Sequence, residues 1–224
     1  MFELKINFDE VVRYLGMKAD NVDDTTAQDI SKAVKLLIDQ ADYKVEYKIF
    51  SIEKKTDGVA VIGTNLMLTG KAIASLLKDC DKCILLAVTL GQNVDALLRK
   101  LQITRLSQAV IADFCASSMV EDLCNQFNDE LKSSHNDQCL FLTDRFSAGY
   151  GDLPLTIQKD FCEVLSTQKT MGLAVTSSGL MIPRKSITAI IGIAKTPQKM
   201  KISGCKYCDF YKDCEYRKGG KVCD

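Results

Sequence analysis

The sequence predicts an α+β protein with a mainly antiparallel, twisted sheet and flanking helices. Apolar residues recur at helical spacing in several segments, whereas other segments alternate or form short β-branched runs. These segments lack the regular strand-helix-strand alternation that is typical of a parallel sheet. A polar, cysteine-rich stretch follows the last apolar run, so we expect a domain over residues 1–200 and a separate tail over residues 201–224.

The N-terminal segments predict two helices and a strand pair. Asn7 or Asp9 is placed to cap the first helix, and Gly16 to end it. The second helix shows the clearest spacing of apolar residues, and the two strands that follow are joined by an Asp-Gly turn. The predicted ranges are helices over 7–16 and 24–41 and strands over 43–52 and 59–63.

The rest of the chain alternates less regularly between helices and strands. We expect helices over 68–77, 93–101, 104–132 and 155–165, and strands over 83–91, 173–182 and 186–194. The longest helix carries one apolar stripe made of Leu106, Val110, Phe114, Cys124 and Leu131. Glu121 lies on that stripe, where a carboxylate is either an edge residue that reaches solvent or a group that faces a ligand.

Charge and composition narrow the class of protein. Lysine and arginine total 29, as do aspartate and glutamate. The chain therefore has no net charge that would attract nucleic acid or an anionic membrane. The start of the chain lacks the pattern of a secretory signal, and the apolar runs are too short to cross a bilayer. We therefore expect a cytoplasmic protein whose ten cysteines are thiols, metal ligands or redox groups.

Several common catalytic motifs are absent from the sequence. There is no glycine-rich dinucleotide turn and no Walker loop, and His135, the single histidine, lies in a polar Ser-Ser-His-Asn-Asp segment without the context of a catalytic triad. There is also no Asp-x-His-x-x-Gly segment that would supply a histidine to cobalamin. Any cobalamin used with this protein is therefore expected on another chain.

One turn, RFSAGYGDLPL over residues 145–155, carries specific chemistry. Arg145 offers a bidentate fork for a carboxylate, the glycines permit close approach of a ligand to the backbone, and Tyr150 has a ring that can cover a flat heterocycle. Together they could hold an amino acid joined to a purine. The alternative is a plain strand-to-helix connection in which Arg145 pairs with Asp152.

This turn resembles the Arg-x-x-x-Gly-Tyr-x-x-x-Pro segment of the reactivation domain of cobalamin-dependent methionine synthase. AVTLGQNVDALL, IADFCASSMVEDL and MGLAVTSSGLMIP are also similar to that family, especially to its short stand-alone bacterial members. The resemblance implies binding of S-adenosylmethionine: Arg145 engages its carboxylate, Ser147 gives backbone contacts, and Gly149 and Tyr150 lie along the nucleoside. Glu121 is the best match to a glutamate that faces the same ligand from the long helix.

The resemblance implies an accessory function. The chain is expected to present S-adenosylmethionine for reductive methylation of the oxidised corrinoid on a separate methionine synthase chain, with flavodoxin or ferredoxin as a candidate electron donor. Two alternatives stay open at this point: an iron-sulfur activator of another corrinoid methyltransferase, and a non-catalytic corrinoid-protein adaptor with a structural zinc.

The C-terminal tail is a separate signal. Cys205, Cys208, Cys214 and Cys223 follow a C-x2-C-x5-C-x8-C spacing, which supplies the number of thiolates that one metal centre needs. Only one C-x2-C knuckle is present, so the spacing favours an iron-sulfur cluster over zinc, with plain thiols as the third alternative. A further C-x2-C at Cys80 and Cys83 lies at a helix-to-strand turn and is interpreted as a pair of structural thiols.

Overall fold

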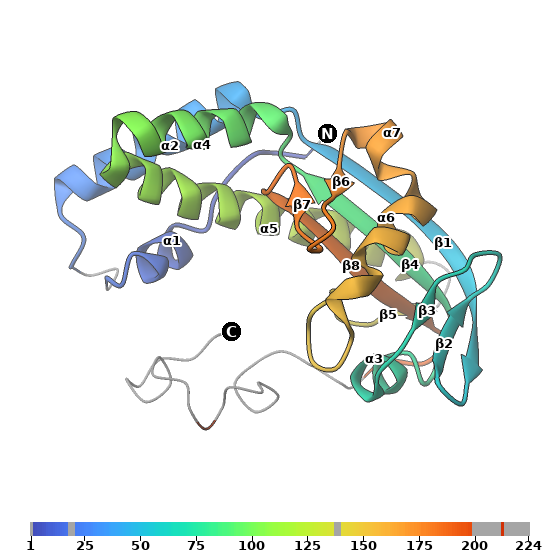
Figure 1. Ribbon diagram of the computed structural model, residues 1–224. Helices are drawn as coiled ribbons and strands as arrows, with labels where there is room; N and C mark the ends of the chain where they lie inside the picture. Colours follow the sequence, from blue (N-terminus) through green and yellow to red (C-terminus); the bar gives the residue numbers. More distant parts are fainter. Residues whose placement is uncertain (1, 18–20, 137–139, 199–211, 213–224) are drawn as a thin grey trace. The chain divides into compact units, whose positions relative to one another are not determined.

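The computed structural model describes residues 2–17, 21–136, 140–198 and 212. The four cysteines of the tail and the boundary predicted at residue 200 lie outside these residues. The elements shown in Figure 1 are, in chain order, α1 (Phe8–Tyr14), α2 (Asp24–Gln40), β1 (Lys44–Lys55), β2 (Gly58–Val61), β3 (Met67–Leu68), α3 (Lys71–Leu76), β4 (Cys80–Thr89), α4 (Gln92–Thr104), α5 (Leu106–Asn136), β5 (Phe141–Leu142), the 3-10 turn η2 (Leu155–Ile157), α6 (Gln158–Leu165), α7 (Thr167–Met171), β6 (Ala174–Val175), β7 (Met181–Ile182) and β8 (Ser186–Ala194).

The predicted α+β fold with an antiparallel sheet is confirmed. Six strands form one sheet in the order β3-β2-β1-β4-β8-β5. The N–H of Asp42, just before β1, bonds the carbonyl of Leu90, just after β4, at 3.1 Å, and the Leu90 N–H bonds the carbonyl of Lys185, just before β8, at 3.0 Å. Because the start of one strand meets the end of its neighbour in both cases, these central strands run antiparallel.

Local sequence signals place most elements correctly. The Asn7 side chain accepts a hydrogen bond from the Glu10 N–H at 3.2 Å and so caps α1. The Asp57-Gly58 turn joins β1 to β2, with Lys55 opposite Gly58. Two predictions are wrong in extent. Residues 67–68 form β3 rather than the start of a helix, and the strand predicted over 173–182 is a hairpin of β6 and β7 in a sheet of its own.

The stripe of α5 that packs into the core differs from the predicted one. Leu106 is 70% exposed and Val110 is 43% exposed, whereas Cys124 and Leu131 are buried as expected. The fully buried side of the helix begins instead with small residues, at Ala109, Ala112, Cys115 and Ala116, and continues with Met119, Val120 and Leu123. Small side chains let the helix axis approach its neighbours closely, which a scan for large apolar residues does not detect.

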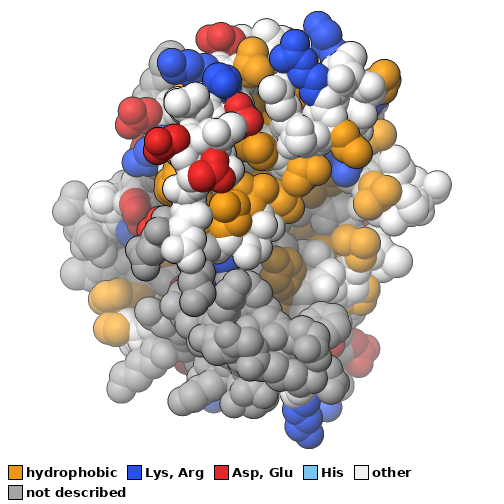
Figure 2. Space-filling model, turned by 90° about the vertical axis from the view of Figure 1, so that its left-hand side faces the viewer, with side chains coloured by type: hydrophobic (Ala, Val, Ile, Leu, Met, Phe, Trp, Pro, Cys, Tyr) orange, Lys and Arg blue, Asp and Glu red, His pale blue; other side chains and the backbone are white. Residues whose placement is uncertain are grey.

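The chain divides into two compact units. Unit 1 comprises Met1–Glu46, Ala87–Leu131 and Leu165–Thr188, and unit 2 comprises Tyr47–Leu86, Lys132–Val164 and Ala189–Asp224. On the face drawn in Figure 2, hydrophobic side chains reach the surface between groups of basic and acidic ones.

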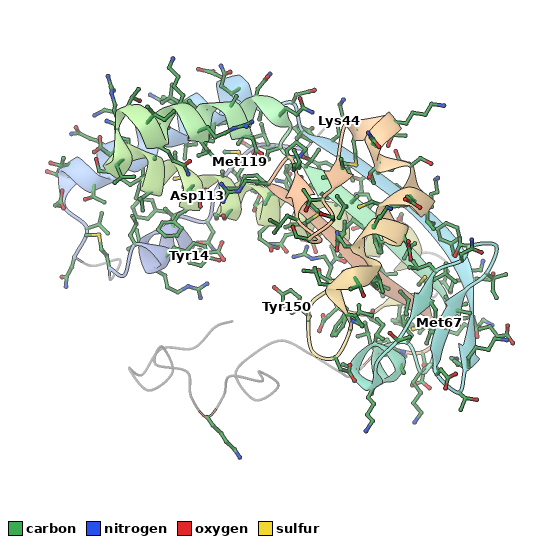
Figure 3. The ribbon with its side chains drawn as sticks, in the orientation of Figure 1. Tyr14, Lys44, Met67, Asp113, Met119 and Tyr150 are labelled. Carbon is green, nitrogen blue, oxygen red and sulfur yellow. The ribbon has the colours of Figure 1, made fainter. Side chains whose placement is uncertain are left out.

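Unit 1 fixes the start of β8 with polar contacts. The half-exposed Asp113 of α5, labelled in Figure 3, pairs with Lys185 at 3.0 Å, and the Lys185 ammonium also donates to the Ser117 hydroxyl at 2.8 Å. The carboxylate of buried Asp95 accepts from the Arg184 N–H at 2.8 Å. These bonds hold the segment after the cis Ile182-Pro183 peptide against α4 and α5.

Unit 2 packs β8 closely at Gly192. The N–H of Gly192 bonds the Thr143 hydroxyl at 2.8 Å, and its carbonyl accepts from the Thr143 N–H at 3.0 Å. A Cβ at this position would lie 2.5 Å from the Cys80 sulfur and 2.8 Å from a methyl group of Leu77. Glycine is therefore needed here for space.

We predict that Gly192→Ala lowers the free energy of unfolding by about 1 to 3 kcal/mol through overpacking. Urea denaturation followed by circular dichroism measures the loss. Cys80→Ala removes the nearest atom, so the Cys80→Ala, Gly192→Ala double variant should lose less than the sum of the two single variants. Wild-type stability in Gly192→Ala would contradict this account of the packing.

Candidate functional site

The turn predicted to bind a ligand begins at a fixed point of the sheet. Phe146 forms an isolated antiparallel bridge with Ile190 of β8, in which the two residues exchange N–H···O bonds of 2.9 and 2.7 Å. The Phe146 side chain is buried, whereas Arg145 before it and Ser147 after it are half-buried. The bridge therefore sets the point from which both predicted ligand contacts leave the sheet.

Internal hydrogen bonds shape the turn after this bridge. The Gly149 N–H bonds the Leu153 carbonyl at 2.9 Å, and the Tyr150 N–H bonds the Ser147 carbonyl at 3.2 Å. Gly149 and Gly151 have φ values of +87° and +51°, a region that side chains disfavour. The turn is thus closed on itself by its own backbone, and its two glycines are conformationally required.

The groups left available on the turn are of the kind that a polar ligand needs. Tyr150 is 67% exposed, and Figure 3 shows its ring projecting from the loop that precedes α6. The N–H groups of Ser147 and Ala148 have no hydrogen-bond partner among the residues that the structure describes. A Cβ on Gly149 would meet only Leu155, at 3.5 Å, so the backbone is open to close approach there.

Asp152 anchors the far end of the turn to α3. Its two carboxylate oxygens accept from the N–H groups of Lys71 and Ala72 at 2.5 and 3.0 Å, so this side chain caps a helix 80 residues earlier in the sequence. These bonds, from Ala72 first and then Lys71, lower the pKa of the Asp152 carboxyl below its usual value of 3.8. Both Asp152 carboxylate oxygens are therefore bonded to α3, whereas the alternative interpretation had paired this residue with Arg145.

Gly70 makes this anchor sterically feasible. Its φ is +128°, and a Cβ there would lie 2.6 Å from an Asp152 carboxylate oxygen and 2.9 Å from the Asp152 carbonyl oxygen. Gly70 at the N-cap of α3 has no side chain that could cap the helix. This missing local cap is the sequence signal that could have pointed to a capping residue elsewhere in the chain.

The five predicted ligand contacts do not all lie in one unit. Arg145, Ser147, Gly149 and Tyr150 belong to unit 2, within six residues of one another. Glu121 lies on α5 in unit 1, where it is half-buried and has an interaction partner. The structure thus brings four of the predicted residues together through local chain geometry.

The cysteines within the described ranges belong to the core. Cys80 and Cys83 are fully buried, and burial raises the pKa of their thiols to about 11 and about 12, respectively. Burial likewise raises the pKa of Cys115 to about 12. These groups stay protonated at neutral pH, which suits packing rather than metal binding. No group of three or more His, Cys, Asp or Glu residues suited to a metal ion occurs among the described residues.

Comparison with known proteins identifies the fold. No family model and no curated protein sequence matches the chain. Among solved structures, the chain is similar to the crystal structure of the MetH reactivation domain bound to AdoHcy, with a TM-score of 0.67 and 14% sequence identity. The similarity covers 96% of this chain and 81% of that one. This chain therefore has the reactivation-domain fold, as the sequence resemblance implied.

Within the described part of the chain, none of the helices is both long and apolar enough to span a bilayer.

We predict that the contact between the turn and α3 depends on pH through Asp152. The carboxyl pKa is lower in the folded chain, so the anchor is complete above the usual value of 3.8 and is lost as the pH falls through the folded pKa. Hydrogen-exchange protection of the Lys71 and Ala72 amides should fall over that acidic range. In Asp152→Asn the protection should be lower at neutral pH and independent of pH, and a wild-type profile in this variant would contradict the anchor.

Proposed function

We propose that this protein is a reactivation subunit that binds S-adenosylmethionine and presents it to a separate cobalamin-dependent methionine synthase chain. The observation that carries the proposal is the turn over 145–155, in which Arg145 precedes the sheet bridge of Phe146 and an exposed Gly-Tyr segment follows it, on a reactivation-domain fold. AdoHcy, which is bound to the similar solved domain, differs from S-adenosylmethionine by one methyl group.

The residues of the turn fit the parts of this ligand. The Arg145 guanidinium supplies paired N–H donors for the carboxylate of an amino acid. The N–H groups of Ser147 and Ala148 can serve its polar atoms, because the N–H groups of Gly149 and Tyr150 are already used inside the turn. The Tyr150 ring offers an exposed flat surface for the nucleoside. When bound, S-adenosylmethionine supplies an electrophilic methyl group.

Glu121 is proposed to complete the site from α5. A carboxylate complements the positive ammonium and sulfonium groups of S-adenosylmethionine, just as Arg145 complements its carboxylate. In this proposal the Glu121 carboxylate faces the positive groups of the ligand, and the Arg145 guanidinium faces the ligand's carboxylate. The chain itself orients the methyl donor, and the corrinoid belongs to the partner.

The tail is proposed to hold a metal centre through Cys205, Cys208, Cys214 and Cys223, which lie outside the described residues. The spacing favours an iron-sulfur cluster, which could accept an electron from a flavodoxin or ferredoxin. The buried thiols of the described chain leave this separate group of cysteines as the proposed place for thiolate chemistry.

Replacing Arg145 tests the ligand site. Arg145→Ala should weaken S-adenosylmethionine binding by about 1.5 to 3 kcal/mol, or about 10- to 150-fold in Kd, because a charge-assisted pair is lost. Isothermal titration calorimetry measures the change, and Arg99→Ala on the exposed side of α4 is the matched control. Unchanged affinity in a folded Arg145→Ala protein would refute the assignment. If Glu121 holds the same ligand, Glu121→Gln and Arg145→Ala should combine non-additively.

Anaerobic purification tests the tail. The proposal predicts a brown protein that contains iron and sulfide and absorbs near about 400 nm, with bleaching on reduction. Truncation after Lys201 should abolish the colour and leave the melting temperature of the remaining chain unchanged. A colourless protein with one equivalent of zinc would contradict the cluster and leave the proposed S-adenosylmethionine site unaffected.

A further inference from the structure

A hollow of about 310 Å³ lies within unit 1, between the middle of α2 and the corner where α4 passes into α5. Helix α2 packs against α4, and Figure 1 shows both of them beside the start of α5. Sites that hold small molecules have volumes of about 300 to 1,000 Å³. The hollow is therefore large enough for a small organic ligand, at the lower end of that range.

Small side chains leave this space open. Ala33 of α2 and Ala112 of α5 line the hollow and are 6% and 1% exposed. A larger residue at either position would fill the space that their methyl groups leave. Buried Leu101 and exposed Leu36 complete the apolar part of the wall. The described residues that line the hollow include no aromatic ring, so the wall suits an aliphatic chain rather than a flat heterocycle.

Polar side chains surround this apolar wall. They are Asp29, Lys32 and Lys35 of α2, with Arg105 and Gln108 at the start of α5. The two lysines and the arginine are exposed. Such side chains place their methylene groups along an apolar wall while their charged ends reach water. These polar residues interrupt the apolar surface, so the site lacks the continuous apolar groove that a partner helix would need.

Two cations of this rim are not neutralised by an acidic side chain of the described chain. The Lys32 ammonium pairs with the Asp29 carboxylate at 3.2 Å, so these two charges offset each other. The Arg105 guanidinium donates to the uncharged Gln108 side chain at 3.3 Å. For the Lys35 ammonium, no partner occurs among the residues that the structure describes. The mouth of the hollow therefore carries excess positive charge, which complements an anion.

We propose that this hollow binds a short aliphatic carboxylate, with its chain against the apolar wall and its carboxylate facing Lys35 and Arg105. Burial of the chain supplies most of the affinity, because the apolar wall removes it from water. The two cations select the charge of the head group. The chain must be short, since the volume is at the lower end of the range for small-molecule sites.

This site is distinct from the proposed S-adenosylmethionine site. The hollow is lined by residues of unit 1 alone, whereas the residues of the turn belong to unit 2. S-adenosylmethionine carries a sulfonium and an ammonium group, which suit neither an apolar wall nor a positively charged rim. The two proposals can therefore fail separately.

Three probes with equal carbon chains test the choice of head group: octanoate, octanol and octylamine. In an NMR titration of the ¹⁵N-labelled chain, octanoate should cause saturable shifts of the Ala33, Leu36 and Ala112 amides. Octanol should bind more weakly, and octylamine most weakly, because the rim repels an ammonium group. The absence of saturable octanoate shifts at these residues up to about 10 mM would overturn the proposal, as would equal affinity for octanoate and octylamine.

Variants of the rim test the role of charge. Lys35→Gln and Arg105→Gln should each weaken octanoate binding about 2- to 5-fold, the scale of exposed ion pairs, and leave octanol binding unchanged. Lys5→Gln, at an exposed lysine of unit 1 that does not line the hollow, is the matched control. Wild-type affinity for octanoate in the double variant of Lys35 and Arg105 would refute the assigned position of the carboxylate.

A matched pair of variants on α2 tests the wall. Leu36→Asn removes part of the apolar wall and should weaken the binding of both octanoate and octanol. Ile38→Asn replaces an apolar residue of similar exposure, 41% against 44%, that does not line the hollow, and it should bind both probes as the wild type does. Both positions are exposed, so both variants should fold. Equal affinities in the two variants would overturn the proposal, since binding would then not depend on this hollow.

Discussion

The antiparallel bridge between Phe146 and Ile190 is the constraint on which the candidate site depends. It ties the start of the turn to β8, a strand whose last seven residues are all buried. β8 is itself held at its start by the bonds of Asp95 and Lys185 and near its end by Thr143. A rigid strand at this position fixes the direction in which Arg145 leaves the sheet, and a site on a rigid element keeps its geometry better than one on an untethered loop.

The turn is anchored at both ends and open in the middle. Phe146 holds its start and Asp152 holds its end through the N-terminus of α3, so the Gly-Tyr segment between them is presented without being packed away. This arrangement explains why an exposed tyrosine and two left-handed glycines occur in succession. It also separates two roles that the sequence places side by side, because Asp152 supports the turn while Arg145 is the proposed contact for the ligand.

Nine of the ten cysteines fall into two groups, one within the described chain and one in the tail. Those of the described chain are buried as small apolar core residues, and burial raises the thiol pKa of Cys80, Cys83 and Cys115. The tail concentrates four more within a polar segment of 19 residues, where thiolate ligands are chemically reasonable. Thiol count alone therefore says little about metal chemistry. The surroundings of each thiol decide it.

The sequence by itself determined the fold class, most helices and strands, and the turn, because these depend on local periodicity, caps and turn residues. Asn7 caps α1 as expected, and Asp57-Gly58 turns the chain between β1 and β2. It did not determine which face of α5 is buried, since close packing there uses alanines where the large residues Leu106 and Val110 were expected. Only the tertiary structure decided the partner of Asp152, because a carboxylate can cap any helix start that the fold brings within hydrogen-bonding distance. That helix lies 80 residues away in the sequence, and no local pattern records a contact of that range.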